Sequence, residues 1–201
     1  MSFSNHLTPL NTFIAQKDRN QLMGHPSFAI WLTGLSGSGK STIANHLDSY
    51  LFSKGIHTYI LDGDNTRTAL SADLGFGEND RLEHLRRMAH VAKLMVDAGI
   101  IPICAFISPL EIQRKLVKGI IGSSHFVLTY VDTPLSICEE RDVKGLYRKA
   151  RMGQIKDFTG VSAPFEVPEN ADIVIPTEQQ SPEESVQVMI NHLNQRYQLS
   201  L

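Results

Sequence analysis

The chain is poor in cysteine, with only two among its 201 residues. Cys104 falls within an apolar run expected to form a strand, and Cys138 falls within a helical pattern. Two isolated thiols build neither a disulfide framework nor a cysteine-rich zinc site, and their positions predict buried groups in a reducing compartment. This pattern argues against an extracellular disulfide scaffold and against catalytic thiol chemistry.

Long apolar runs are also missing. No stretch of the chain approaches the roughly 18 consecutive apolar residues that cross a membrane. The N-terminus has no cationic segment followed by an apolar stretch, which a secretory signal would need. We therefore expect a cytoplasmic protein without a membrane partner.

The chain carries little net charge, because 19 Lys and Arg stand against 21 Asp and Glu to give −2. Such a balance creates no general attraction for nucleic acid, so a small-molecule partner is expected. The eight histidines show no metal-ligand spacing such as His-Glu-x-x-His, and we assign them no such role. The length and the 42% hydrophobic content suit one α/β domain.

One glycine-rich segment is the most informative part of the sequence. It reads Gly34-Leu35-Ser36-Gly37-Ser38-Gly39-Lys40-Ser41-Thr42, with a strand-like run before it and a helical pattern after it. In a phosphate-binding loop of this kind, backbone N–H groups surround the phosphates, Lys40 reaches the terminal phosphates and the Ser41 hydroxyl ligates Mg²⁺. The segment predicts a nucleoside triphosphate site, and a glycine-rich turn that binds nothing is the alternative.

Apolar runs alternate with helical patterns along the chain, which favours a parallel sheet joined by helical crossovers. Strands are expected at residues 28–33, 57–61, 100–107, 126–131 and 173–175, forming an α/β three-layer fold with five parallel strands flanked by helices. An irregular leader at residues 1–26 precedes a single domain at residues 27–201. Asp80 with Glu83, and Ser181 with Glu184, predict helix starts by capping boxes.

Polar residues follow the expected strands at their carboxyl ends, where ligands bind in open α/β sheets. Asp62 and Asp64 follow the second strand, Ser108 the third and Asp132 the fourth. One of the paired aspartates could hold Mg²⁺ and orient the proton of an attacking hydroxyl in phosphoryl transfer. A solvated Asp-Gly turn is the alternative for the pair, and a helix start before Pro134 is the favoured interpretation of Asp132.

Basic residues form two further groups. Arg67 and Arg81 stand in or next to the loop that contains Phe76, where bidentate capture of phosphate or sulfate competes with simple surface charge. Arg86 and Arg87 suit a solvated helix face. A basic, glycine-containing stretch predicts a mobile lid at about residues 141–165 that excludes water on closure. A solvated, charged helix is the alternative for that stretch.

Further motifs occur in order between about residues 16 and 177. They are Asp62-Gly63-Asp64-Asn65-Thr66-Arg67, Leu74-Gly75-Phe76, Asp80-Arg81, Phe106-Ile107-Ser108-Pro109, Lys144-Gly145-Leu146-Tyr147 and Phe158-Thr159-Gly160. Together with the phosphate-binding loop, they closely resemble the adenylylsulfate kinase family. The resemblance implies a P-loop NTPase fold of the nucleotide-kinase type and a homodimer. It also implies transfer of the ATP γ-phosphate, with Mg²⁺, to the 3′-hydroxyl of adenosine 5′-phosphosulfate (APS) in sulfate assimilation. The products are 3′-phosphoadenosine 5′-phosphosulfate and ADP.

The same resemblance implies the site residues. ATP is expected on residues 34–42, Mg²⁺ at Ser41 and Asp62, and catalytic roles at Lys40, Asp62 and Ser108. APS is expected at Asp64, Asn65, Arg67, Phe76, Arg81, His84, Ile107, Ser108, Lys144 and Phe158. Phe76 and Phe158 could clamp the adenine of APS, because glycine-bearing polar loops are poor places to bury a phenylalanine for packing alone.

Three positions need comment. His84 stands where the family usually has asparagine, and residues 110–114 contain less arginine than usual, which puts individual acceptor contacts in question. Ser108 is often described in the family as a phosphoserine intermediate, yet no histidine or lysine is adjacent to it in the chain. We expect Ser108 to contact the acceptor instead.

Two other functions fit parts of the pattern. One is a P-loop kinase for another small hydroxylated acceptor, against which the two phenylalanines argue, since they suit a flat base. The other is a nucleotide-dependent switch module without acceptor chemistry, against which the aspartate pair and the basic lid argue.

Overall fold

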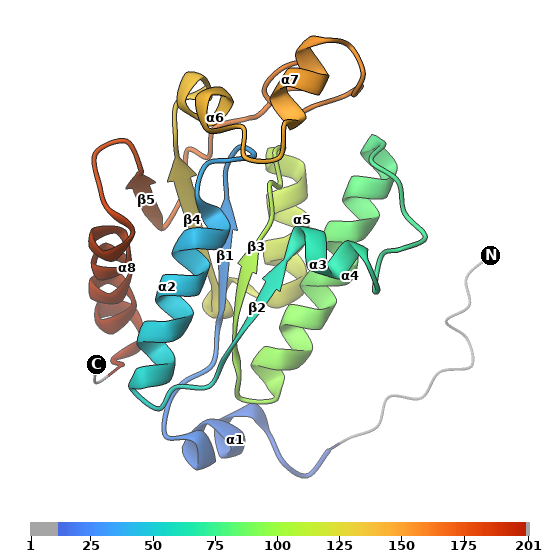
Figure 1. Ribbon diagram of the computed structural model, residues 1–201. Coiled ribbons are helices and arrows are strands. Elements are labelled where there is room, and N and C mark those ends of the chain that lie inside the picture. The colour runs from blue at the N-terminus through green and yellow to red at the C-terminus, as the bar shows by residue number, and fades with distance from the viewer. Residues whose placement is uncertain (1–11, 200–201) are drawn as a thin grey trace, which may run out of the picture.

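A computed structural model of the protein describes residues 12–199. Within this range five parallel strands form one sheet in the order β2-β3-β1-β4-β5 (Figure 1). The strands are β1 (Ala29–Thr33), β2 (Thr58–Asp62), β3 (Ile101–Ala105), β4 (Phe126–Asp132) and β5 (Ile173–Pro176). Every residue of the central strand β1 is buried. Such burial is typical of a parallel strand covered on both faces.

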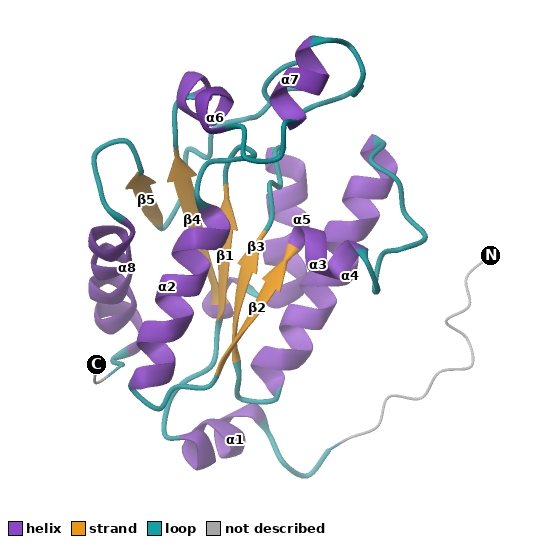
Figure 2. Ribbon diagram, in the orientation of Figure 1, coloured by secondary structure: helices purple, strands orange, loops and turns teal. Residues whose placement is uncertain are grey.

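Helices cover both faces of the sheet (Figure 2). α2 (Lys40–Ser53) and α8 (Pro182–Tyr197) share one face, and α4 (Glu78–Asp97) and α5 (Glu111–Ile121) share the other. Side chains alternate along β1, so Ile30 and Leu32 join the core beneath α2 and α8, whereas Trp31 joins the core beneath α4 and α5. The sheet therefore separates two apolar cores.

Shorter helices lie at the ends of the sheet. α1 (Gln16–Met23) comes before β1, α3 (Gly63–Arg67) follows β2, and the 3₁₀ turn η2 (Ser123–His125) comes before β4. α6 (Leu135–Arg141) and α7 (Leu146–Arg151) lie beyond the carboxyl edge of the sheet, at the top of Figure 1. The expected lid thus lies over the edge of the sheet that carries the phosphate-binding loop.

The expected sheet is confirmed, because all five strands occur and each end differs from its prediction by at most two residues. The capping box at the start of α8 is also confirmed. The N–H of Ser181 donates to Glu184 at 2.8 Å, and the N–H of Glu184 donates back to the Ser181 hydroxyl at 3.2 Å.

Three local expectations are wrong. The leader is not irregular throughout, since α1 occupies part of it, while residues 1–11 lie outside the described range. α4 begins at Glu78, and the Asp80 carboxylate accepts the N–H of Gly75 at 3.0 Å instead of capping its own helix. Asp132 accepts the hydroxyl of Tyr130 at 2.9 Å, and α6 starts only after Pro134.

Cys104 and Cys138 are buried and unpaired, as expected. Burial raises the pKa of the Cys104 thiol, which keeps it protonated and unreactive. Between residues 12 and 199 the structure has no helix that combines the length and the apolar character needed to cross a membrane.

Candidate active site

The phosphate-binding loop joins β1 to α2 at the carboxyl edge of the sheet (Figure 1). Gly34 has a φ of 151°, and a Cβ at this position would lie 2.6 Å from the carbonyl oxygen of Val131. Only glycine allows so close an approach to β4. The loop ends at the N-terminus of α2, where free N–H groups and the helix dipole favour phosphate.

The Lys40 side chain is folded into this loop. Its ammonium donates to the carbonyl oxygens of Gly34 at 3.0 Å and Leu35 at 2.6 Å, and it lies 3.4 Å from the Ser38 hydroxyl. Burial lowers the pKa of Lys40 to about 8, because the charged amine loses hydration. The amine in this loop therefore loses its charge at a lower pH than an ordinary lysine does.

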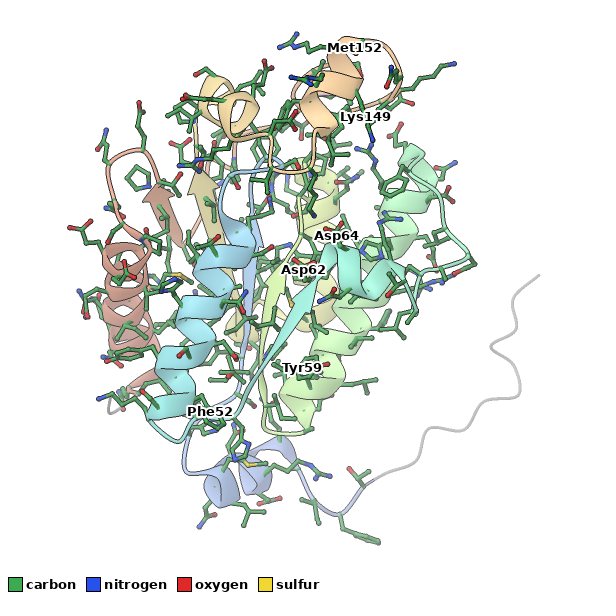
Figure 3. All side chains as sticks on the ribbon, viewed as in Figure 1. Phe52, Tyr59, Asp62, Asp64, Lys149 and Met152 are labelled. Carbon is green, nitrogen blue, oxygen red and sulfur yellow. The ribbon has the colours of Figure 1, made fainter. Side chains whose placement is uncertain are left out.

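Ser41 and Asp62 meet where the phosphate-binding loop approaches the end of β2. The Ser41 hydroxyl donates to Oδ2 of Asp62 at 2.7 Å, and Oδ1 of Asp62 accepts the N–H of Asp64 at 3.0 Å, which caps α3. Figure 3 shows Asp62 at the end of β2, with Asp64 just beyond it at α3. The contact brings together two hard oxygen ligands from separate elements, a donor set that suits Mg²⁺.

No larger metal-binding cluster accompanies this pair. Over residues 12–199, no three His, Cys, Asp or Glu side chains gather where they could hold a metal ion. Mg²⁺ is ordinarily held by one or two protein oxygens together with phosphates and water, so the Ser41 and Asp62 oxygens are a sufficient protein share.

A cavity of about 410 Å³ opens on the phosphate-binding loop. Its walls come from three segments: residues 36–43, residues 141–147, and the chain from the end of β5 to the start of α8. Sequence reasoning missed the third wall, which includes Thr177, Gln180, Pro182 and Ser185. The signal was available, because these residues follow a strand at its carboxyl end just as the aspartates do.

Thr177 connects this third wall to the phosphate-binding loop. Its hydroxyl lies 2.5 Å from the hydroxyl of Thr133, which contacts the carbonyl oxygen of Ser38 at 3.0 Å. The N–H of Thr177 donates to the carbonyl oxygen of Asp132 at 3.0 Å. These contacts fix the wall against the loop, although nothing in the spacing of these residues predicted the network.

The expected acceptor residues of the loop before α4 lie together. The guanidinium of Arg67 stacks 4.6 Å from the centre of the Phe76 ring and donates to the carbonyl oxygen of Gly75 at 2.8 Å. Arg81 donates to the carbonyl oxygen of Phe76 at 2.7 Å. Two guanidinium groups, one from α3 and one from α4, thus contact the same short loop, and Phe76 remains 68% exposed beside them.

The lid contacts the two helices that flank this loop, α3 and α4, at one point each. Lys144 forms an ion pair with Asp64, and Arg81 reaches the other end of the lid, donating to the carbonyl oxygen of Asp157 at 2.6 Å and to the hydroxyl of Thr159 at 3.0 Å. Four residues that were expected to bind the substrate therefore already have partners within the protein. They are Asp64, Arg67, Arg81 and Lys144. An acceptor that binds here must replace some of these contacts.

Phe158 is buried, with 9% of its surface exposed. Its ring packs edge-on against Tyr147, with 5.0 Å between ring centres, in a small cluster that also contains Cys138 and Ala150. The expectation that this loop is a poor place to bury a phenylalanine is wrong, because residues of the lid, α6 and the phosphate-binding loop together form a small core around it. A role for Phe158 in stacking stays a prediction.

Ser108 is 2% exposed and has a φ of 37°. Its hydroxyl oxygen accepts the indole N–H of Trp31 at 3.0 Å, and its carbonyl oxygen accepts a bond from Arg114 at 3.0 Å. The neighbouring carbonyl of Ile107 accepts the hydroxyl of Thr33 at 2.6 Å. No base contacts the Ser108 hydroxyl in the described part of the chain, so the structure offers nothing that would activate it as a nucleophile.

His84 is buried in the first turns of α4, with 4% of its surface exposed. One ring nitrogen lies 2.9 Å from the hydroxyl of Ser71, and the ring stands edge-on to Phe106 with 5.4 Å between centres. Burial, followed by the positive charges of Arg67 and Arg87, lowers the pKa of His84 to about 4. The ring is therefore neutral at physiological pH.

Asn65, expected to contact the acceptor, and Arg86, expected on a solvated helix face, both lie on the surface. Asn65 is exposed on α3, and Arg86 is exposed on α4, where it pairs with Glu83 at 2.7 Å. Arg87 does more than cover a solvated face, because it pairs with both Glu83 and Asp73 and so joins α4 to the preceding loop.

The chain matches the protein family described as adenylylsulphate kinase over residues 26–176. The adenylyl-sulfate kinase of Shewanella amazonensis is 47% identical over 189 residues, which cover 94% of this chain and 96% of the relative. That of Staphylococcus epidermidis is 48% identical over 195 residues, with 97% and 98% covered. The solved structure of the Mycobacterium tuberculosis APS kinase in complex with AMPPNP and APS has a TM-score of 0.82 and 44% identity. That match covers 85% of this chain and 99% of the other.

Proposed function

The chain belongs to the adenylylsulfate kinase family, and we propose that it transfers the γ-phosphate of ATP to the ribose 3′-hydroxyl of APS. The products are 3′-phosphoadenosine 5′-phosphosulfate and ADP. The observation that carries the proposal is the contact between Ser41 and Asp62, which joins the phosphate-binding loop to the end of β2 at 2.7 Å. The γ-phosphate of the donor and the 3′-hydroxyl of the acceptor would thereby meet at one carboxylate.

ATP would occupy the cavity on the phosphate-binding loop. Its phosphates suit the N-terminus of α2 and the Lys40 ammonium, which leaves the rest of the cavity for the nucleoside. Binding would move Lys40 from loop carbonyl oxygens to phosphate oxygens. That exchange restores the charge that burial disfavours, because a neighbouring anion raises the pKa of a lysine.

Ser41 and Asp62 would hold Mg²⁺. When bound, the ion neutralises charge that accumulates on the phosphate oxygens during transfer. Asp62 would also act as the general base, because its hydrogen bonds leave lone pairs unused. Each carboxylate oxygen accepts one hydrogen bond within the protein and has a further lone pair, which can accept the proton of the attacking hydroxyl.

The acceptor would lie against Arg67 and Arg81, whose guanidinium groups suit the phosphosulfate. Asp64, Lys144 and the exposed ring of Phe76 would complete its contacts. Asn65, His84, Ile107, Ser108 and Phe158 are proposed on the resemblance alone. The contacts of Lys144 and Arg81 across the lid support closure over the acceptor, which would favour transfer over hydrolysis by water.

We further propose a homodimer that works in the cytoplasm and in sulfate assimilation, as the family resemblance implies. These proposals do not depend on the site geometry. Light scattering on the purified chain tests the dimer directly, because a monomeric mass at assay concentration would contradict it.

A coupled assay of ADP release tests the proposed reaction. ATP and Mg²⁺ are supplied with APS, with no acceptor, and with a sugar acid in place of APS. We expect release to depend on APS, and Lys40→Ala to reduce it by about 100-fold or more, since the lysine stabilises transferring charge. Equal release without acceptor would favour a switch module. Release with the sugar acid alone would favour a different kinase, and either result would overturn the proposal.

A further inference from the structure

The turn after β3 holds Ser108 in a conformation that serine rarely adopts. Ser108 is buried, and its φ of 37° lies in the left-handed region that favours glycine. Such a backbone persists only where the surrounding groups determine it, and it often marks a functional site. Contacts of the turn with the rest of the fold must therefore offset the strain.

Arg114, on α5, contacts two carbonyl groups of this turn. Its Nη1 donates to the carbonyl oxygens of Ser108 and Pro109, each at 3.0 Å. Its Nε and Nη2 donate to one carboxylate oxygen of Glu111 at 3.2 and 3.0 Å, which fixes the plane of the guanidinium. Arg114 is 3% exposed, so these charge-assisted bonds are shielded from water. They restrain the peptide that follows Ser108.

The peptide before Ser108 is held from β1. The Thr33 hydroxyl donates to the carbonyl oxygen of Ile107 at 2.6 Å, and the Trp31 indole donates to the Ser108 hydroxyl at 3.0 Å. The carbonyl group on one side of Ser108 is thus fixed by β1, and the carbonyl group on the other side is fixed by Arg114. Together these contacts determine the backbone angles of Ser108.

The turn lies where the proposed function places the reaction. Asp62 pairs in register with Ala105, three residues before Ser108, so the turn continues β3 beside the carboxylate that would hold Mg²⁺. Thr33, which contacts the turn, directly precedes the phosphate-binding loop. The next step rests on the proposed function, in which the acceptor contacts Ile107 and Ser108. A displaced turn would then displace the acceptor.

We propose that Arg114 is a positioning residue for the acceptor. It acts without touching either substrate, because it keeps the Ser108 turn in the strained shape that receives APS. Glu166, which directly follows the lid, supports the same turn. Its N–H donates to the carbonyl oxygen of Pro109 at 2.9 Å, and its carboxylate accepts the N–H of Glu111 at 2.6 Å. The start of α5 and the end of the lid are therefore attached to the turn together.

Steady-state kinetics and titration calorimetry with ADP test the proposal. Arg114→Met removes the guanidinium and keeps an unbranched side chain. Lys115→Met is the matched control, because Lys115 is an exposed neighbour on α5 that pairs with the same Glu111. We expect Arg114→Met to lower kcat/KM for APS by about 10- to 100-fold, the range for charged hydrogen bonds to buried groups. The affinity for ADP, measured without acceptor, should change less than about threefold. Lys115→Met should change neither quantity.

Glycine at position 108 separates positioning from simple support of the fold. Glycine adopts a positive φ without strain and alanine does not, whereas both substitutions remove the same hydroxyl. In the Arg114→Met background, Ser108→Gly should therefore exceed Ser108→Ala in kcat/KM for APS by about fivefold or more. Equal values for the two double variants would overturn the proposal, as would an ADP affinity that falls in parallel with kcat/KM.

Trp31 provides a measurement that needs no acceptor. It is the only tryptophan of the chain and donates to Ser108, so its fluorescence reports on the turn. Arg114→Met should shift the emission, and Lys115→Met should not. An unchanged emission in Arg114→Met would contradict the assignment even if the wild type phosphorylates APS. A shifted emission in a protein that does not phosphorylate APS would refute the proposed acceptor and keep the hold of Arg114 on the turn.

A second substitution covers the case in which Arg114→Met fails to unfold cooperatively on heating. Arg114→Lys keeps the positive charge but replaces the planar fork with a single ammonium, which cannot hold two carbonyl groups and Glu111 in the same geometry. It should show the same selective loss of kcat/KM for APS and the same recovery with Ser108→Gly. A variant Arg114→Lys that is indistinguishable from the wild type in both kinetics and emission would overturn the proposal.

Discussion

At the scale of single residues, the burial of Lys40 makes donor binding depend on pH. Its pKa of about 8 means that Lys40 in the free enzyme loses its proton, and its attraction for phosphate, as pH rises through that value. We expect kcat/KM for ATP to fall about tenfold per pH unit above about pH 8, whereas kcat persists to higher pH because bound phosphates favour the charged amine.

Steady-state kinetics between about pH 6.5 and about pH 10 measure this fall. Lys40→Arg is the control, because a guanidinium stays charged over the whole range and should abolish the alkaline fall in kcat/KM, whatever activity remains. A wild-type kcat/KM that stays flat to pH 10 would contradict the assignment of the titrating group.

Asp62 should affect turnover far more than acceptor affinity. Asp62→Asn removes the negative charge that holds Mg²⁺ and accepts the proton, and asparagine still caps α3, so the fold should survive. We expect kcat to fall about 100-fold or more while KM for APS changes less than about threefold. Asp64→Asn, which breaks the ion pair with Lys144, should change both constants. If Asp62→Asn raised only KM, the roles of the two aspartates would have to be exchanged.

Ser108 should be dispensable as a nucleophile. Its hydroxyl is taken up by the indole of Trp31 and has no base beside it, so direct transfer from ATP to the acceptor is the simpler route. We expect Ser108→Ala to keep substantial turnover. The wild type incubated with γ-labelled ATP in the absence of APS should acquire no stoichiometric label. A phosphoserine at this position that forms and decays as fast as turnover would restore a two-step mechanism.

Contiguous residues of the site could be predicted from the sequence, and residues brought together by the fold could not. The phosphate-binding loop lies in one segment, so its spacing alone indicates its chemistry. Gln180 and Thr177 reach the cavity only because β4 and β5 are neighbours in the sheet. Phe158 was misjudged for a related reason, since its burial depends on Tyr147 and Cys138, which contact it only after the lid folds.

At the scale of elements, the contact between lid and phosphate-binding loop depends on Gly160. This residue has a φ of 88°, and a Cβ there would lie 3.0 Å from Leu35 and 3.2 Å from Leu135. Gly153, with a φ of 72°, has no atoms within 4 Å of the same position, so Gly153→Ala is a matched control. Both variants should lose about 1 kcal/mol of unfolding free energy to backbone strain.

Gly160→Ala should cost about 1 kcal/mol more than the control, because its methyl group crowds both leucines. It should also raise KM for ATP, since Leu35 belongs to the phosphate-binding loop. Chemical denaturation and steady-state kinetics on the two variants measure these differences. Equal stability and equal KM for both variants would mean that the lid does not pack on the loop in solution.

The elements that the sequence predicted well are those with apolar periodicity. The five strands and α8 all bury side chains in the two cores, which leaves a pattern in the chain. α1 was missed because none of its residues is buried, so it has no apolar stripe. The start of α4 was misplaced because the Asp80 carboxylate accepts a hydrogen bond from Gly75 in the preceding loop. The spacing of a capping box in the sequence does not reveal such a partner.

At the scale of the whole molecule, the proposed function depends on residues that lie at one edge of the sheet. The segments that follow β1 and β5 form walls of the cavity, β2 ends at the Asp62 carboxylate, and the lid crosses above this edge (Figure 1). The ion pair between Lys144 and Asp64 and the bonds from Arg81 to the lid connect the lid to α3 and α4, where we propose that the acceptor binds. Such an arrangement supports direct transfer between two bound substrates.

Transfer of label from γ-labelled ATP to APS tests this claim most directly. In a single turnover of the wild type with Mg²⁺, the account predicts that the label appears in 3′-phosphoadenosine 5′-phosphosulfate, from which a 3′-specific phosphatase then releases it. Lys40→Ala should give no such product in the same time. Label recovered as inorganic phosphate without labelled product, or retained on the protein, would contradict direct transfer to the 3′-hydroxyl.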